Sequence, residues 1–144
     1  MTSAPHIRLV LWKAAKAIEK VDRASIDGTG LQLSEFTIME ALLHKGPLPI
    51  NTIGEKVLLT SGSMTAAINR LEKKSFVRRS RDTSDGRFFH VHLTEIGRLV
   101  IKDAYQKHAA NLEQVSAVLT GMERHELVRL LRKLGHQAEQ VRVT

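Results

Sequence analysis

The chain has 144 residues, enough for one ordinary folded domain, and we expect no separate catalytic domain beside it. Its formal net charge of +7 favours a polyanionic partner such as a nucleic acid. The absence of cysteine excludes disulfides, thiolate zinc sites and cysteine redox sensing. No secretory pattern or membrane-spanning apolar run is present, so a cytoplasmic protein without a membrane partner is expected.

The first predicted helix precedes the glycine-rich turn at residues 27–30. Its apolar residues recur at alternating steps of four and three and form one heptad-like stripe: Ile7, Leu11, Ala14, Ile18 and Val21. A second helix is predicted to begin near Ser34, whose hydroxyl can cap it, and to end at Gly46. Phe36 and Met39 would face inward from this helix.

A short helix is predicted from Ile50, after a link framed by Pro47 and Pro49. The next helix begins at Thr60 or Ser61, either of which can cap it. Three of its apolar residues must face the core: Met64, Ile68 and Leu71. Small and polar residues lie opposite: Gly62, Thr65, Ala66, Asn69 and Lys73.

Residues 76–94 form two strand-like runs around an Asp85-Gly86 tip, which is typical of a β-hairpin. Between residues 61 and 92 there are seven cations against three acids. The cations are Arg70, Lys73, Lys74, Arg78, Arg79, Arg81 and Arg87. Helix, turn, helix and basic hairpin is the order of a winged helix-turn-helix, which we assign to residues 34–97. The expected fold is therefore mainly α with a small β-hairpin.

Two further helices complete the chain. Thr94 is predicted to cap a long helix, and Thr120 with Glu123 forms a capping box for the last one. Both helices carry apolar stripes at heptad spacing: Ile101, Tyr105, Leu112, Val115 and Leu119 on one, and Leu127, Leu131, Leu134, Ala138 and Val141 on the other. One small domain would struggle to bury these stripes, so we expect a homodimer held by residues 1–25 and 110–144 within the single winged-helix chain 1–144. The alternative is an intramolecular helical layer over the central module.

Three motifs follow one another in order: Leu71-Glu72-Lys73-Lys74-Ser75-Phe76-Val77-Arg78-Arg79, then Asp85-Gly86-Arg87, then Leu93-Thr94 with Gly97. Together with the order of the helices, they resemble the MarR family of bacterial transcriptional regulators. The resemblance implies a dimeric winged-helix protein that binds pseudo-palindromic operators, usually as a repressor. It also implies that a small anionic or phenolic effector often releases the DNA. In the wing, it implies that Asp85 shapes the hairpin while Arg87 reaches into the minor groove.

Two residues depart from the family pattern. Ser75 stands where the family commonly has a glycine, at a helix end that often needs a left-handed backbone, so a differently shaped or a mildly strained turn is expected. Ala66 stands where many members place an arginine in the recognition helix, which removes a familiar guanine contact.

The candidate DNA contacts combine small groups, which let the helix approach the bases closely, with an amide and several cations. Asn69 can pair bidentately with adenine, and Arg70 or Lys73 can neutralise phosphate charge. The full set is Ser61, Ser63, Thr65, Asn69, Arg70, Lys73, Arg79, Arg81 and Arg87, with double-stranded DNA as the partner. For each of them the alternative is a solvated surface residue.

The family resemblance also implies an effector pocket between the DNA-binding module and the dimer helices. The residues that could line it are Trp12, Phe36, Met39, Tyr105 and His108, although each could equally be an ordinary core residue. His90 and His92 share one face of a strand, but no third ligand is evident, so neither a metal nor another cofactor is expected.

No catalytic constellation is visible, so we do not expect an enzyme. The competing hypothesis is a winged-helix module for architectural DNA binding or protein interaction, without operator specificity. The small, polar face that ends at Asn69 favours base reading over a protein interface, where exposed aromatic residues and leucines would be expected.

Overall fold

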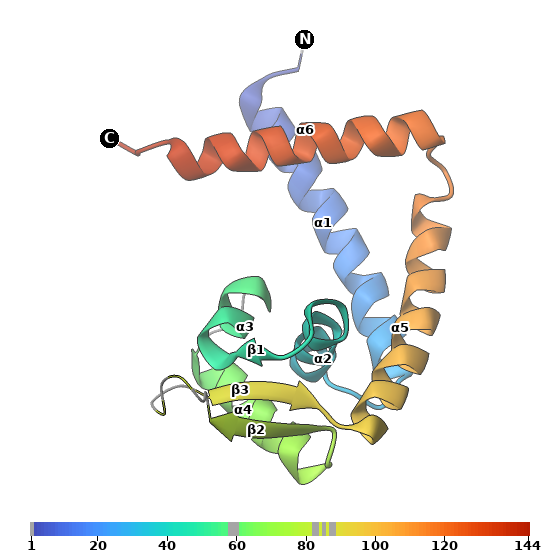
Figure 1. The fold of residues 1–144 in the computed structure, drawn as a ribbon. Helices are drawn as coiled ribbons and strands as arrows, with labels where there is room; N and C mark the ends of the chain where they lie inside the picture. The colour runs from blue at the N-terminus through green and yellow to red at the C-terminus, as the bar shows by residue number, and fades with distance from the viewer. Residues whose placement is uncertain (1, 58–60, 82–83, 85, 87–88) are drawn as a thin grey trace.

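The computed structural model describes residues 2–57, 61–81, 84, 86 and 89–144, and it is mainly helical with one small sheet (Figure 1). The expected fold class is confirmed. The elements, in chain order, are α1 (Ala4–Asp27), α2 (Leu33–Lys45), β1 (Leu48–Pro49), α3 (Ile50–Val57), α4 (Ser61–Lys73), β2 (Val77–Arg81), β3 (Phe89–Leu93), α5 (Glu95–Ser116) and α6 (Gly121–Gln140).

The sheet is antiparallel, with the order β1-β3-β2. Strands β2 and β3 pair from Val77 opposite Leu93 to Arg81 opposite Phe89, as predicted for the hairpin. The prediction missed β1, because the segment with Pro47 and Pro49 was interpreted only as a link. Pro49 is tolerated there because β1 is an edge strand, where a backbone N–H is dispensable.

The core lies between the sheet and α2, α4 and α5. Helix α2 packs against α1, α3, α4, α5 and β3, so it is the central element of this part of the molecule. The buried apolar side chains include Phe36, Ile38, Met39 and Leu42 from α2, Ile53 from α3, Met64, Ile68 and Leu71 from α4, Val77 and Val91 from the sheet, and Ile101 and Ala104 from α5. The core faces predicted for α2 and α4 are thus confirmed.

Of the four predicted helix caps, two are confirmed, and the one at Thr60 or Ser61 lies outside the described side chains. Thr94 caps α5 and Thr120 caps α6, where the capping box with Glu123 is formed. The cap predicted at Ser34 is wrong, since α2 begins two residues earlier, after Gln32. The backbone N–H of Gln32 donates to the Glu35 carboxylate at 2.8 Å, which leaves the Ser34 hydroxyl available to another partner.

Helix α5 begins in close contact with the turn between α4 and β2. The Thr94 hydroxyl donates to the Ser75 carbonyl at 2.6 Å and accepts from the Gly97 N–H at 3.0 Å. A Cβ atom at Gly97 would lie 1.9 Å from the Phe76 carbonyl oxygen, so only glycine allows this approach. The first turn of α5 is therefore seated directly on the backbone that leads into β2.

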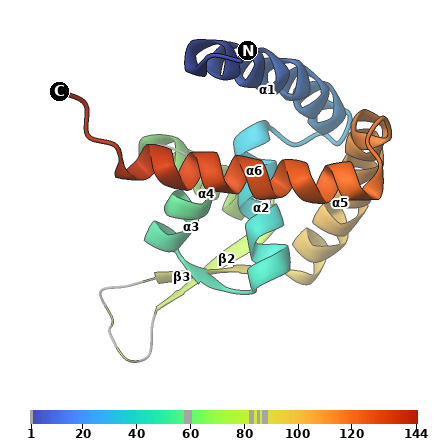
Figure 2. The same cartoon turned by 90° about the horizontal axis from the view of Figure 1, so that it is seen from above.

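Helices α1 and α6 extend beyond this core. Helix α6 lies on the side away from the sheet and crosses α1 in the view of Figure 1, whereas the view from above shows the two helices apart and α6 in front of α2 (Figures 1 and 2). It buries none of its residues, so it does not form a layer that covers the central module. Among the described residues, no helix is both long enough and apolar enough to cross a bilayer.

Candidate nucleic-acid interface

The second helix of the helix-turn-helix, α4, presents a polar face to solvent. Its core residues Met64, Ile68 and Leu71 turn this face outward, as the periodicity predicts. The exposed residues are Gly62, Ser63, Thr65, Ala66, Asn69 and Lys73. Ser61 is the first helical residue, and its side chain lies outside the described part, as does Thr60. The helix thus presents the small residues at its start on the same surface as the Asn69 amide and the Lys73 ammonium.

Strand β2 is joined to this face by Arg79. The Arg79 guanidinium donates to the side-chain oxygen of Asn69, and its Nε lies 2.7 Å from a carboxylate oxygen of Glu72. Two predicted DNA contacts, Asn69 and Arg79, therefore contact each other in the DNA-free protein. Sequence reasoning placed both at the site but not in contact, because their pairing depends on how the hairpin packs.

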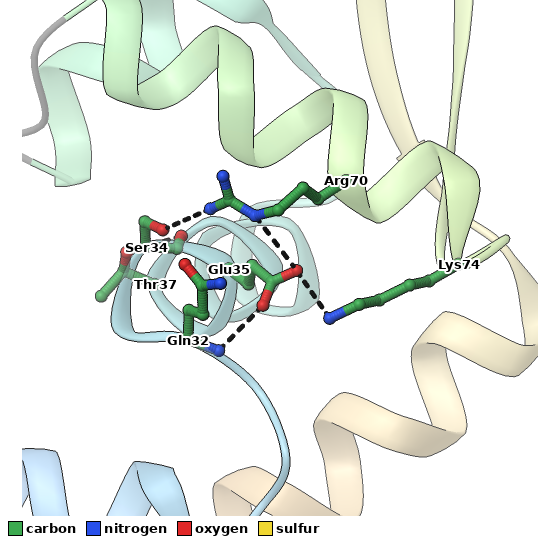
Figure 3. A network of polar contacts seen from close by, with 6 residues as sticks. All are labelled: Gln32, Ser34, Glu35, Thr37, Arg70 and Lys74. Atoms are coloured by element: carbon green, nitrogen blue, oxygen red, sulfur yellow. Dashed lines mark hydrogen bonds and ion pairs between the residues drawn. The ribbon is translucent and has the colours of Figure 1, made fainter.

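Arg70 points away from the exposed face and toward α2. Its guanidinium donates to the Ser34 hydroxyl at 3.1 Å, and its Nε lies 3.8 Å from a Glu35 carboxylate oxygen (Figure 3). Lys74 reaches the same carboxylate at 2.8 Å. Sequence reasoning did not include Glu35 in the site. The signal was an acidic residue beside Phe36 and Ile38 on the buried side of the helix.

The described part of the wing consists of its two strands together with Ser84 and Gly86. Arg81 is exposed at the end of β2, and its guanidinium lies 5.4 Å from the centre of the Phe89 ring, a cation–π contact. Asp85 and Arg87, predicted to shape the tip and to enter the minor groove, lie outside the described residues.

The two histidines of β3 stay on one side of the strand. His92 Nε2 lies 2.6 Å from the Ser80 hydroxyl. Burial lowers the pKa of His92, and the nearby charges of Arg78 and His90 lower it further. Among the described residues, no group of three or more metal-ligating side chains comes together.

Of the five candidate effector residues, Phe36 and His108 contact each other edge to face, with ring centroids 4.9 Å apart. Phe36 and Met39 are sealed in the core, and Tyr105 is partly buried with its ring against His44. His108 is also buried, between Ser25 at 3.1 Å and Asp22 at 3.4 Å. Trp12 is 52% exposed on α1, between Arg8 and Lys16.

A cavity of about 590 Å³ lies elsewhere, where the end of α1 and the start of α2 meet α4. Its polar lining includes Arg23, Asp27, Ser34, Ser63 and Arg70. Sequence reasoning had not grouped these residues, because they come from three separate helices.

A helix-turn-helix with an exposed polar face on its second helix, followed by a basic hairpin, defines a winged-helix DNA-binding protein.

The model described as MarR family matches residues 31–88 of this chain. The HTH-type transcriptional regulator MhqR of Bacillus subtilis is 33% identical over 132 residues, which cover 92% of this chain and 91% of the relative. The chain belongs to the MarR family of transcriptional regulators.

Two solved structures share the fold. One is a mutant MarR from E. coli complexed with operator DNA, with a TM-score of 0.76, 20% identity and coverage of 91% of this chain and 94% of that chain. The other is Bordetella bronchiseptica BpsR, whose DNA binding is regulated by 6-hydroxynicotinic acid. It has a TM-score of 0.78 and 22% identity, and the match covers 90% of this chain and 98% of that chain. The relatives compared here are regulators rather than enzymes.

Proposed function

We propose that this protein is a cytoplasmic repressor that binds a pseudo-palindromic operator as a homodimer. The observation that carries the proposal is the exposed face of α4, where small residues precede Asn69 and Lys73 beside a basic hairpin. Such a face can enter the major groove and place an amide at base edges. The operator-DNA complex of the E. coli MarR mutant supports the same use of this fold.

The proposed DNA contacts fall into three groups. Ser61, Ser63 and Thr65 approach the backbone and base edges at the start of α4, Asn69 reads a base, and Lys73 neutralises a phosphate. In the wing, Arg81 and Arg87 reach the minor groove, and Asp85 shapes the tip. Arg70 and Arg79 were predicted as contacts too. Their ion pairs with Glu35 and Glu72 give them a second role, which is to hold α4 and β2 in place.

The proposed dimer is formed by α1 and α6. A nearly apolar groove of about 630 Å³ runs between these helices, lined among others by Ile7, Leu11, Ile18, Leu127 and Leu131. Exposed apolar stripes of this size are unusual on a monomer. A second copy of the chain is the occupant that we propose, because the stripes on both helices have the heptad spacing of helices that pack together.

We further propose that a small organic molecule releases the DNA, by analogy with BpsR and its 6-hydroxynicotinic acid. Trp12, Phe36, Met39, Tyr105 and His108 remain the predicted lining. Because Phe36 and Met39 are sealed in this conformation, ligand entry there requires α2 and α5 to separate.

Selection of bound duplexes from a random DNA pool, followed by footprinting, tests the proposal. We expect one enriched sequence with two half-sites about one helical turn apart, matching the two reading helices of a dimer. Binding to random DNA that equals binding to the selected duplex at the same salt concentration would instead support an architectural binder. Absence of any DNA binding would favour a protein-interaction module.

A further inference from the structure

We infer that Glu35 is the positioning residue of the DNA-reading helix. Its side chain on α2 is completely buried, and it holds the C-terminal end of α4 in the orientation that the reading face needs. The inference rests on the proposed function, since it assigns a role within the same DNA-binding site. Glu35 itself is placed to touch no DNA.

Both carboxylate oxygens of Glu35 have partners (Figure 3). One oxygen accepts from the backbone N–H of Gln32 at 2.8 Å, and the other accepts from the Lys74 ammonium at 2.8 Å. Arg70 Nε lies 3.8 Å from the second oxygen, close enough for charge attraction. The same guanidinium also donates to Ser34, the neighbour of Glu35. Helix α2 thus contacts the end of α4 at two cations one helical turn apart.

A buried carboxylate tolerates little movement of its partners. Because it has lost its water, its charge is compensated only by the groups that it touches, so Lys74 and Arg70 must stay in place. The apolar contacts of Ile68 and Leu71 do not have this directionality, since the hydrophobic effect depends on the area buried and not on the angle of a contact. The carboxylate therefore adds a directional restraint on the rotation and the axial position of α4 to the packing of the core.

We call the contact of Glu35 with Arg70 and Lys74 the clamp. Both of its cations are direct chain neighbours of residues proposed to contact DNA. Arg70 follows Asn69, and Lys74 follows Lys73 in the chain. Any rotation of α4 that breaks the clamp consequently moves Asn69 and Lys73 as well. Base recognition requires placement to within about 0.5 Å, whereas attraction to phosphates does not. Loss of the clamp should thus reduce discrimination between DNA sequences rather than binding as such.

Glu35→Gln is the main test variant, because glutamine keeps the shape and can still accept from Gln32 but lacks the charge. The matched control is Glu19→Gln, which neutralises a glutamate in an exposed ion pair with Arg23 on α1. Both variants change the formal net charge from +7 to +8. The probes are the duplex that the wild type selects from a random pool and a random-sequence duplex of equal length.

For Glu35→Gln we expect the ratio of selected to random affinity to fall roughly tenfold, the loss typical of one misplaced base contact. Affinity for random DNA should stay level or rise with the added positive charge. A merely structural role would instead lower both affinities in proportion to the folded fraction. That result, or an unchanged ratio in a folded variant, overturns the inference.

Lys74→Met is the second variant, needed if Glu35→Gln does not fold, since it leaves Glu35 with Gln32 and Arg70. The same drop in ratio is expected, and an unchanged ratio counts against the clamp. Amide NMR shifts of the free protein provide a readout without DNA. We expect changes along α4 in both variants and none there in Glu19→Gln. A wild type that selects no sequence refutes the proposed function, whereas unchanged α4 shifts refute the clamp alone.

Discussion

Arg79 on β2 donates a hydrogen bond to the side-chain oxygen of Asn69 on α4, and so joins the wing stem to the reading helix. Bidentate pairing with adenine uses this same amide oxygen as an acceptor. For the proposed base contact, Asn69 must therefore release Arg79 or share its oxygen with it. Glu72 keeps Arg79 in place during this exchange, because its carboxylate lies 2.7 Å from Arg79 Nε.

Asn69→Ala should weaken binding to the selected duplex by about 1–3 kcal/mol, the usual value of a bidentate base contact. Thermal unfolding should change little, since Asn69 is exposed and Arg79 retains Glu72. Fluorescence anisotropy measures the affinity, with Gln106→Ala on the exposed side of α5 as the control. Equal affinity of the two variants would remove Asn69 from the reading face.

Lys73→Ala should weaken binding to all duplexes alike, because Lys73 is proposed to contact a phosphate rather than a base. The slope of log affinity against log salt concentration should become shallower by about 1. Lys107→Ala removes an equal charge from an exposed ion pair on α5 and serves as the control. A salt slope that matches the wild type would place Lys73 outside the interface.

The pKa of His92 should lie below its usual value of 6.5, and Arg78→Ala should raise it, since the Arg78 charge is one of the causes of the shift. A lowered pKa means that the unfolded chain takes up the proton first. The contribution of His92 to the free energy of unfolding is therefore complete above pH 6.5, and it is lost as the pH falls toward the folded-state pKa. NMR titration checks the midpoint, with Arg98→Ala on α5 as the control. A midpoint that does not respond to Arg78 would contradict the prediction.

Leu131→Glu should dissociate the proposed dimer. Leu131 lines the apolar groove between α1 and α6, and two-fold symmetry would bury two unpaired carboxylates there. The dimer dissociation constant should rise roughly a hundredfold or more, as sedimentation equilibrium can measure. Leu99→Glu, at an exposed position of α5 outside both expected dimer segments, should have no such effect. Unaltered association of Leu131→Glu would place the interface elsewhere.

Ser75→Gly should stabilise the fold by about 0.5–1 kcal/mol. Ser75 has a φ of 63°, a left-handed backbone that favours glycine, and this confirms the strained turn expected from the sequence. Ser75→Ala keeps a side chain in the left-handed backbone, so it should not raise the free energy of unfolding. Urea unfolding of the three proteins checks the order, and an alanine variant as stable as the glycine variant would show that the turn carries no strain.

Local patterns in the sequence were sufficient for most of the fold. The steps between Met64, Ile68 and Leu71 depend only on helix geometry, and the Thr94 cap depends on groups three residues apart. Strand β1 was missed because its two residues pair with Val91 and His90, some forty positions away, and no local pattern encodes such pairing.

The candidate site was predictable as a region but not as a set of contacts. The sequence alone groups Arg70, Lys74 and Arg79 with the other cations of residues 61–92 as one basic patch. In the structure these three side chains form ion pairs with Glu35 or Glu72. Glu35 and Lys74 are 39 residues apart, so only the packing of α2 against α4 reveals which charges face inward.

Helix α5 joins the sheet to α6 as one uninterrupted rod. Its 22 residues correspond to a length of about 33 Å, and Gly97 seats one end on the Phe76 carbonyl. Such a rod acts as a mechanical lever: a tilt of about 5° at one end moves the other by about 3 Å, close to the 3.4 Å rise of one base pair. In the proposed dimer, a small change of angle between the two α5 helices would therefore shift the two α4 helices by about one base-pair step along the DNA.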